Sequence, residues 1–118
     1  MVELKKLPAV FYCTATGNEP VREWLKELDA ADRRIIGYDI AIAEFGWPVG
    51  MPVCRSLGKG LYEIRSDISH GRIARVIFCI AGQRMVLLHG FIKKTQKTQK
   101  TQKTELDLAL KRKKEVTS

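Results

Sequence analysis

The second half of the chain carries side chains that could bind and cut a phosphodiester. Seven cations and two histidines form this set: Arg55, Lys59, Arg65, Arg72, Arg75, Lys93, Lys94, His70 and His89. Preorganised cations can stabilise the extra negative charge of a pentavalent transition state, often a large catalytic contribution. In RNA the 2′-hydroxyl is a built-in nucleophile, so the reaction needs a base for its proton and an acid for the leaving 5′-oxygen. Histidine, or a lysine whose pKa is lowered by neighbouring cations, can move such protons.

Motifs for other chemistries do not occur in the sequence. It contains no GxxxxGK[ST] loop, no HExxH, no metal-spaced Cys/His pair and no Gly-x-Ser-x-Gly. Glu63 is the only acid inside the apolar segments of the second half, and Asp67 lies at their edge. Two-carboxylate hydrolysis and metal-dependent nuclease chemistry are therefore disfavoured, and we expect neither a metal ion nor another cofactor.

Each candidate residue also has a structural interpretation. Arg65 and Arg75 interrupt apolar segments, which is costly unless each guanidinium has a partner or lies in a cleft. A structural pair with Glu63 or Asp67 is the alternative to a catalytic role. His89 lies in the run RMVLLHGF, which suits a hydrogen-bonded core or edge histidine as well as a catalytic one.

Three successive strands must position these side chains. Leu61–Asp67 alternates between two faces, Arg72–Ile80 is rich in β-branched and aromatic residues, and Arg84–Phe91 is a third apolar run. The connectors Ser69–Gly71 and Ala81–Gln83 are of hairpin length, and each contains a glycine. The pattern predicts an antiparallel meander.

The first half predicts a short strand, Pro8–Thr14, and two helices joined almost without a loop. Asn18 is a good N-cap for the first helix and Asp29 for the second, which runs to about Phe45. A further strand is expected over Val53–Leu57, leading into the meander. The first helix has one apolar face at helical spacing, made by Val21, Trp24, Leu25 and Leu28.

Charge is distributed unevenly along the chain. The net charge is +8, but residues 1–52 hold six basic and eight acidic groups, whereas residues 53–118 hold fifteen basic and five acidic groups. This asymmetry favours a polyanionic partner, with nucleic acid first, although a basic surface that only aids solubility is the alternative.

A triplet, Thr-Gln-Lys, occurs three times from Thr95 to Lys103. Because it contains no apolar residue, we expect an exposed, mobile linker there. We accordingly predict a single domain over 1–94, a linker over 95–104 and a basic C-terminal helix over 105–118. No apolar run is long enough to span a membrane, and no signal-peptide pattern is seen, so a cytoplasmic location is expected.

Several segments of the chain resemble the HigB-like, phage-derived branch of the RelE/ParE toxin superfamily. They are NEPVREWLKEL, LGKGLYEIRSD, GRIARVIFCI, VLLHGFIKKTQKT and LDLALKRKKE, and together they span most of the chain. The most specific is LHGFIKKTQKT. The chain departs from the family pattern after it, because extra Thr-Gln-Lys units stand where the family has a proline.

The resemblance implies an α+β, RelE-like fold. Its parts are an N-terminal strand and a helical hairpin packed on a curved antiparallel sheet of about four strands, plus a C-terminal helix. It also implies the toxin of a type II toxin–antitoxin system, a metal-independent endoribonuclease that binds the 70S ribosome and cuts mRNA. A helix-turn-helix antitoxin, HigA-like, is the implied partner. ParE-like relatives share the fold but inhibit DNA gyrase, and a non-enzymatic nucleic-acid-binding protein is a further alternative.

The resemblance assigns site residues by position. Arg65 and Arg75, with Lys59 before the first meander strand, match the basic cleft of the family, and His89 belongs to its end-of-sheet motif. We predict these four as catalytic residues. A second set is predicted to bind RNA: Arg55, Arg72, Phe91, Lys93 and Lys94, of which Phe91 can stack on a base.

Overall fold

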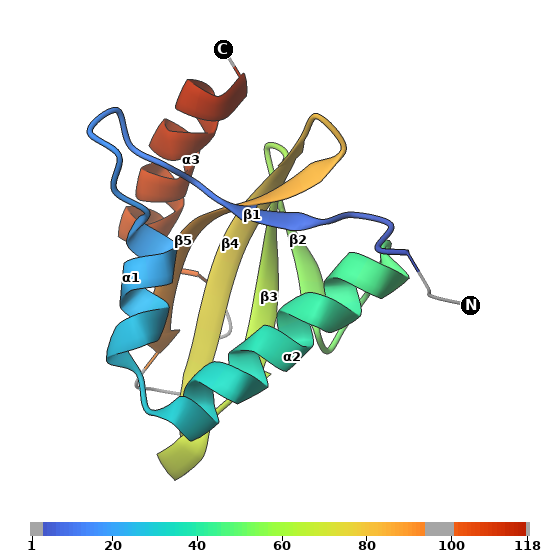
Figure 1. Cartoon of the computed structure of the whole chain (residues 1–118), viewed down its shortest axis with the longest axis vertical. Coiled ribbons are helices and arrows are strands. Elements are labelled where there is room, and N and C mark those ends of the chain that lie inside the picture. Colours follow the sequence, from blue (N-terminus) through green and yellow to red (C-terminus); the bar gives the residue numbers. More distant parts are fainter. Residues whose placement is uncertain (1–3, 94–100, 118) are drawn as a thin grey trace.

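The computed structural model describes residues 4–93 and 101–117, and helices cover both faces of a single sheet (Figure 1). The elements follow in the order β1 (Ala9–Phe11), α1 (Pro20–Glu27), α2 (Ala30–Gly46), β2 (Cys54–Gly58), β3 (Leu61–Asp67), the 3₁₀ turn η1 (Ser69–Gly71), β4 (Ile73–Ala81), β5 (Arg84–Lys93) and α3 (Lys103–Thr117). This α+β architecture is the one predicted, and it is consistent with a RelE-like fold.

The sheet has the strand order β1-β5-β4-β3-β2. Strands β2 to β5 are antiparallel to their neighbours, and the N-terminal strand β1 pairs with β5 in parallel. Gly82 and Gln83, with φ of 57° and 60°, form the two-residue turn between β4 and β5. Positive φ at both turn residues matches the right-handed twist of paired strands, so the predicted meander is confirmed.

The first face of the sheet is covered by α1 and α2, which lie over β5 and β3 respectively (Figure 1). Strand alternation sends Ile64 and Phe78 to this face, where both are fully buried. Phe78 lies edge-on to Trp47 and is stacked with Tyr62, with ring centroids 5.6 and 5.5 Å apart. Both helices contribute buried apolar residues to this core, as the helical spacing predicts: Val21 and Leu25 from α1, and Ile36, Ile40 and Ala43 from α2.

Among the described elements, α3 packs against the second face, over β5 and β4 (Figure 1). Ala109 of α3 is fully buried in a smaller cluster against Leu61, Ile77 and Leu88. Arg112 fixes the helix further, because its Nη1 donates a hydrogen bond of 2.7 Å to the Leu88 carbonyl. The charged side chains of the strands share this face with the cluster.

The helix starts differ in part from the sequence prediction. Asp29 is the N-cap of α2 as predicted, but Glu19 and not Asn18 precedes α1. Asn18 instead belongs to the preceding turn, where its backbone N–H donates to the Thr14 hydroxyl at 3.0 Å and its side-chain amide donates to Thr16. The cap prediction failed because a local turn competes for the same polar groups.

Candidate active site

A row of predicted site residues crosses the second face of the sheet. Alternation along β3 places Glu63 and Arg65 opposite the core-facing residues of the same strand. The strand register then sets Arg55 beside Glu63, and Arg75 between Arg65 and Phe91. Four neighbouring strands therefore bring together five of the predicted residues, namely Arg55, Arg65, Arg75, Phe91 and, two residues further along β5, Lys93.

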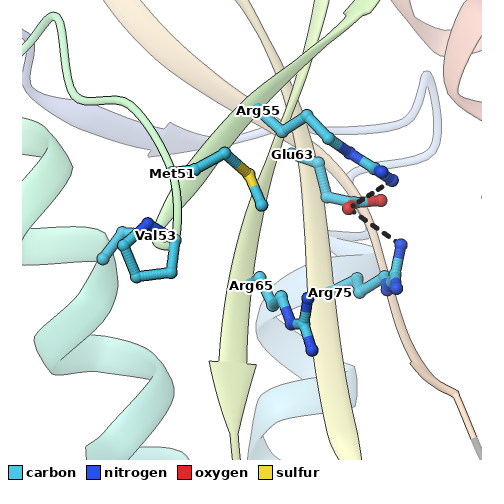
Figure 2. Close-up of a pocket in the computed structure, with 7 residues that line it drawn as sticks. Met51, Val53, Arg55, Glu63, Arg65 and Arg75 are labelled. Atoms are coloured by element: carbon cyan, nitrogen blue, oxygen red, sulfur yellow. Dashed lines mark hydrogen bonds and ion pairs between the residues drawn. The ribbon is translucent and has the colours of Figure 1, made fainter. Parts of the chain in front are cut away.

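Glu63 is the acceptor at the centre of this row. Its Oε1 accepts hydrogen bonds from Arg55 Nη2 at 3.1 Å and from Arg75 Nη1 at 3.0 Å (Figure 2). Glu63 and Arg75 are each only 2% exposed, whereas the Arg55 side chain is 29% exposed. A buried carboxylate of this kind is tolerated because two guanidinium groups compensate its charge. Arg75 thus pairs with Glu63, one of the two acidic partners that the sequence allowed as an alternative to a catalytic role.

Arg65 lies on β3 across from Arg75 in the register, with its guanidinium apart from the Glu63 carboxylate (Figure 2). It is half-buried, so it is more accessible than Arg75. Its backbone N–H donates to the Val53 carbonyl at 2.8 Å, which holds the loop before β2 against the sheet. Arg65 therefore stands where the charged row meets that loop.

Lys93 closes the row at the end of β5. Its side chain is 9% exposed, and burial lowers its pKa below the ordinary lysine value of 10.5. The positive charge of Arg75 lowers the pKa further, while Glu63 opposes that effect. A lysine in this setting can act as a proton acceptor as well as a phosphate ligand.

His89 is held by the C-terminal helix. Its Nε2 lies 2.9 Å from Glu105 Oε2, and its ring is stacked on Phe91 with centroids 5.4 Å apart. A carboxylate bonded to one ring nitrogen fixes the orientation and the tautomer of an imidazole. His89 and Phe91 therefore form an ordered pair on the same sheet face as the charged row.

Thr101 covers the charged row, and sequence reasoning missed it. The Thr101 hydroxyl donates to Glu63 Oε2 at 2.5 Å and lies 3.3 Å from Arg55 Nη2 and 3.5 Å from Arg75 Nη1. The cavity among these arginines, Glu63 and Met51 measures about 10 Å³, enough for no more than one water molecule. As far as the described residues show, this cavity is too small for a nucleotide.

The other predicted residues lie elsewhere. Lys59, in the turn between β2 and β3, lines a separate groove of about 200 Å³ beside α3. Arg72 donates to the buried Asp32 carboxylate at 2.9 Å and to Ser69, so it ties the β3–β4 turn to α2. Lys94 lies outside the described residues. The roles predicted for these three remain predictions.

Sequence comparison agrees with this geometry. The five-stranded sheet and its three helices are consistent with a RelE-like fold. The chain belongs to the family of phage-derived Gp49-like proteins (DUF891), whose model matches residues 23–114, from α1 to α3. That family is toxin-like, of the RelE/HigB type. No curated protein matches the chain. Among the described residues, no helix combines the length and the apolarity needed to cross a bilayer.

Proposed function

We propose that this protein is the toxin of a type II toxin–antitoxin pair and an endoribonuclease that cuts mRNA on the ribosome. The observation that carries the proposal is the row of cations on one sheet face, in which Arg55, Arg65, Arg75 and Lys93 meet beside the ordered pair of His89 and Phe91. The chain belongs to the Gp49-like family, and this membership supports its assignment as a toxin.

The proposed reaction uses the substrate's own nucleophile. The 2′-oxygen attacks the adjacent phosphorus, the bond from phosphorus to the 5′-oxygen breaks, and a 2′,3′-cyclic phosphate and a 5′-hydroxyl result. Lys93 in its neutral form accepts the proton of the 2′-hydroxyl, and His89, oriented by Glu105, donates one to the 5′-oxygen. Arg65 and Arg75 bind the phosphoryl oxygens, whose charge grows in the transition state.

Substrate must replace Thr101 for this reaction to occur. The Thr101 hydroxyl oxygen lies within reach of two arginines, the position that a phosphate oxygen needs. A phosphodiester brings a full negative charge, so it is the stronger acceptor for guanidinium groups. We propose that ribosome-bound mRNA displaces the Thr101 side chain from the row.

The proposed partner is a helix-turn-helix antitoxin of the HigA-like kind. The test is expression of the chain with and without the neighbouring antitoxin gene, followed by mapping of 5′ ends on cellular mRNA. The proposal expects growth arrest with new 5′ ends inside translated frames, both suppressed by the antitoxin. Arrest with intact transcripts would contradict it.

One observation favours a second candidate function, the gyrase inhibition of ParE-like relatives. Arg55 and Arg75 already pair with the Glu63 carboxylate, and the cavity beside them is too small for a nucleotide. A toxin without nuclease chemistry has no need of an open site. Supercoiling assays with purified gyrase distinguish the two, because the endoribonuclease leaves supercoiling unchanged.

A further inference from the structure

A larger groove lies beside the charged row and begins at Arg65. It measures about 430 Å³ and is lined by Ile35 and Asp39 of α2, Pro52 and Val53 of the loop before β2, and Arg65 and Asp67 of β3. Ligand pockets generally fall between about 300 and 1,000 Å³. Pro52, Val53 and Arg65 also line the small cavity among the arginines, so the two spaces share a wall.

The groove lies at the edge of the sheet, where β2 no longer covers β3. The pairing of β2 with β3 starts at Cys54, and the loop before it is held by the hydrogen bond from Arg65 N–H to the Val53 carbonyl. Asp39 of α2 lies near the start of β2, because its negative charge raises the pKa of Cys54. Burial makes the larger contribution to that rise, and the pKa of Cys54 reaches about 11. Asp67, the last residue of β3, is exposed.

The chemistry of the lining divides at Arg65. On its inner side lie Arg55, Arg75 and Lys93, which attract a phosphate. On its outer side lie two carboxylates and apolar walls, which repel a phosphate and accept hydrogen bonds from an uncharged donor. A nucleotide with its phosphate at Arg65 and its base in the groove would match this division of charge.

We propose that this groove is a subsite for a guanine base of single-stranded RNA, with Asp39 and Asp67 as the residues that determine base specificity. Guanine presents two neighbouring donors, N1–H and the N2 amino group, on the edge that an unpaired base exposes, whereas uracil presents one. Proteins read unpaired RNA bases by such edges, and a carboxylate can accept both donors. Ile35 and Pro52 supply apolar surface for the base faces. The inference rests on the proposed function, since it adds the base preference of the same site.

The test measures binding separately from cleavage. Fluorescein-labelled 2′-O-methyl pentanucleotides lack the nucleophilic hydroxyl, so they bind without being cut. Anisotropy titrations of the full chain at fixed salt compare oligonucleotides whose central base is guanine, inosine or uracil. We expect guanine to bind about tenfold more tightly than inosine, which lacks the N2 amino group, or uracil, in keeping with the usual discrimination by a bidentate contact.

Variants identify the residues responsible. Asp39→Asn and Asp67→Asn together should remove the guanine preference, whereas the matched Asp29→Asn should retain it, because exposed Asp29 at the start of α2 makes no side-chain cap hydrogen bond. Equal affinities for the guanine and inosine oligonucleotides in the wild type would overturn the proposal, and so would a preference that survives the double substitution. The two carboxylates of the groove would then suit a basic side chain of a protein partner. Absence of mRNA cleavage would refute the endoribonuclease but not a measured guanine preference.

Discussion

The two faces of the sheet differ in what they bury. The face under α1 and α2 buries an apolar core with a stacked aromatic group, whereas the face toward α3 buries Glu63 and Arg75 beside a smaller apolar cluster. Both faces are built by the same strands, since neighbouring residues of β3 alternate between them. Asp32 and Glu44 of α2 are also buried, but their cationic partners are partly exposed, whereas Glu63 and Arg75 are both buried. Buried charge adds less to stability than apolar packing of similar volume, so a pair with both members buried is a candidate for a functional role.

Removing Arg75 should have the largest effect. Arg75→Ala leaves the buried Glu63 carboxylate with Arg55 and Thr101 alone, and breaking a buried pair costs about 3–5 kcal/mol of folding free energy. Denaturant unfolding measures this loss. We also expect mRNA cleavage to fall about 10²–10³-fold, the usual cost of losing one donor to a transition state.

A compensating substitution separates folding from chemistry at Arg75. Glu63→Gln combined with Arg75→Ala removes the stranded charge, so stability should largely recover while cleavage stays low. Recovery of both would mean that Arg75 serves only the fold.

Neighbouring residues of β3 provide a sharper comparison of the two faces. Arg65→Ala, on the charged face, should lower cleavage about 10²–10³-fold with little change in unfolding free energy, because the side chain is only half-buried. Ile64→Val, on the apolar face, should cost about 0.5–1.5 kcal/mol of stability with cleavage per folded molecule unchanged. Primer extension and urea unfolding on both variants check this pair. An Arg65→Ala variant that cuts mRNA at the wild-type rate would contradict the assignment of catalysis to the charged face and of stability to the apolar face.

Strand β3 shows which features of the site a single sequence can predict. Alternation in β3 and the hairpin connectors predicted which side chains share a face, because strand geometry is local. The partner of Arg75 was left open between Glu63 and Asp67, since register and burial decide it. Thr101 gave no signal, because a polar repeat has no apolar pattern that would predict a buried face, and its contact with Glu63 joins residues 38 positions apart.

The pairing of Arg72 was missed for a related reason. Asp32 fits the start of a helix, where an acid favours the dipole, yet its carboxylate is buried and accepts hydrogen bonds from Ser69 and Arg72. The backbone N–H of Ser69 is the largest of the contributions that lower the pKa of Asp32, and Arg72 adds to it. Contacts between a helix and a distant turn depend on packing, which a single sequence does not display.

Lys93 should make both the stability and the mRNA cleavage depend on pH, and this effect should be of intermediate size. Its pKa is lowered in the folded protein, so the charged form is disfavoured there, and the cost to stability is present at low pH and shrinks as the pH rises toward 10.5. If neutral Lys93 accepts the proton of the 2′-hydroxyl, cleavage should rise up to tenfold per pH unit below the pKa of Lys93 in a His89→Ala background, where deprotonation of the general acid no longer offsets the rise. Lys93→Arg keeps the charge but should abolish that rise between about pH 6.5 and 9. Identical pH profiles for both proteins would exclude Lys93 as the base.

Thr101→Val should have the smallest effect. The substitution preserves the shape of the side chain but removes its hydrogen bond to Glu63, which contributes about 1 kcal/mol. We expect faster hydrogen exchange at the start of α3 and cleavage raised a few-fold, because substrate displaces Thr101 more easily. A variant with reduced cleavage would instead make Thr101 part of the binding site.

The most direct test of the central claim is the mapping of mRNA 5′ ends after translation with purified ribosomes and purified protein. Wild-type protein should produce new 5′-hydroxyl ends within the translated frame, and Arg65→Ala should produce about 10²–10³-fold fewer at equal concentration of folded protein. Intact mRNA with the folded wild-type protein present would contradict the assignment of the charged face as an endoribonuclease site.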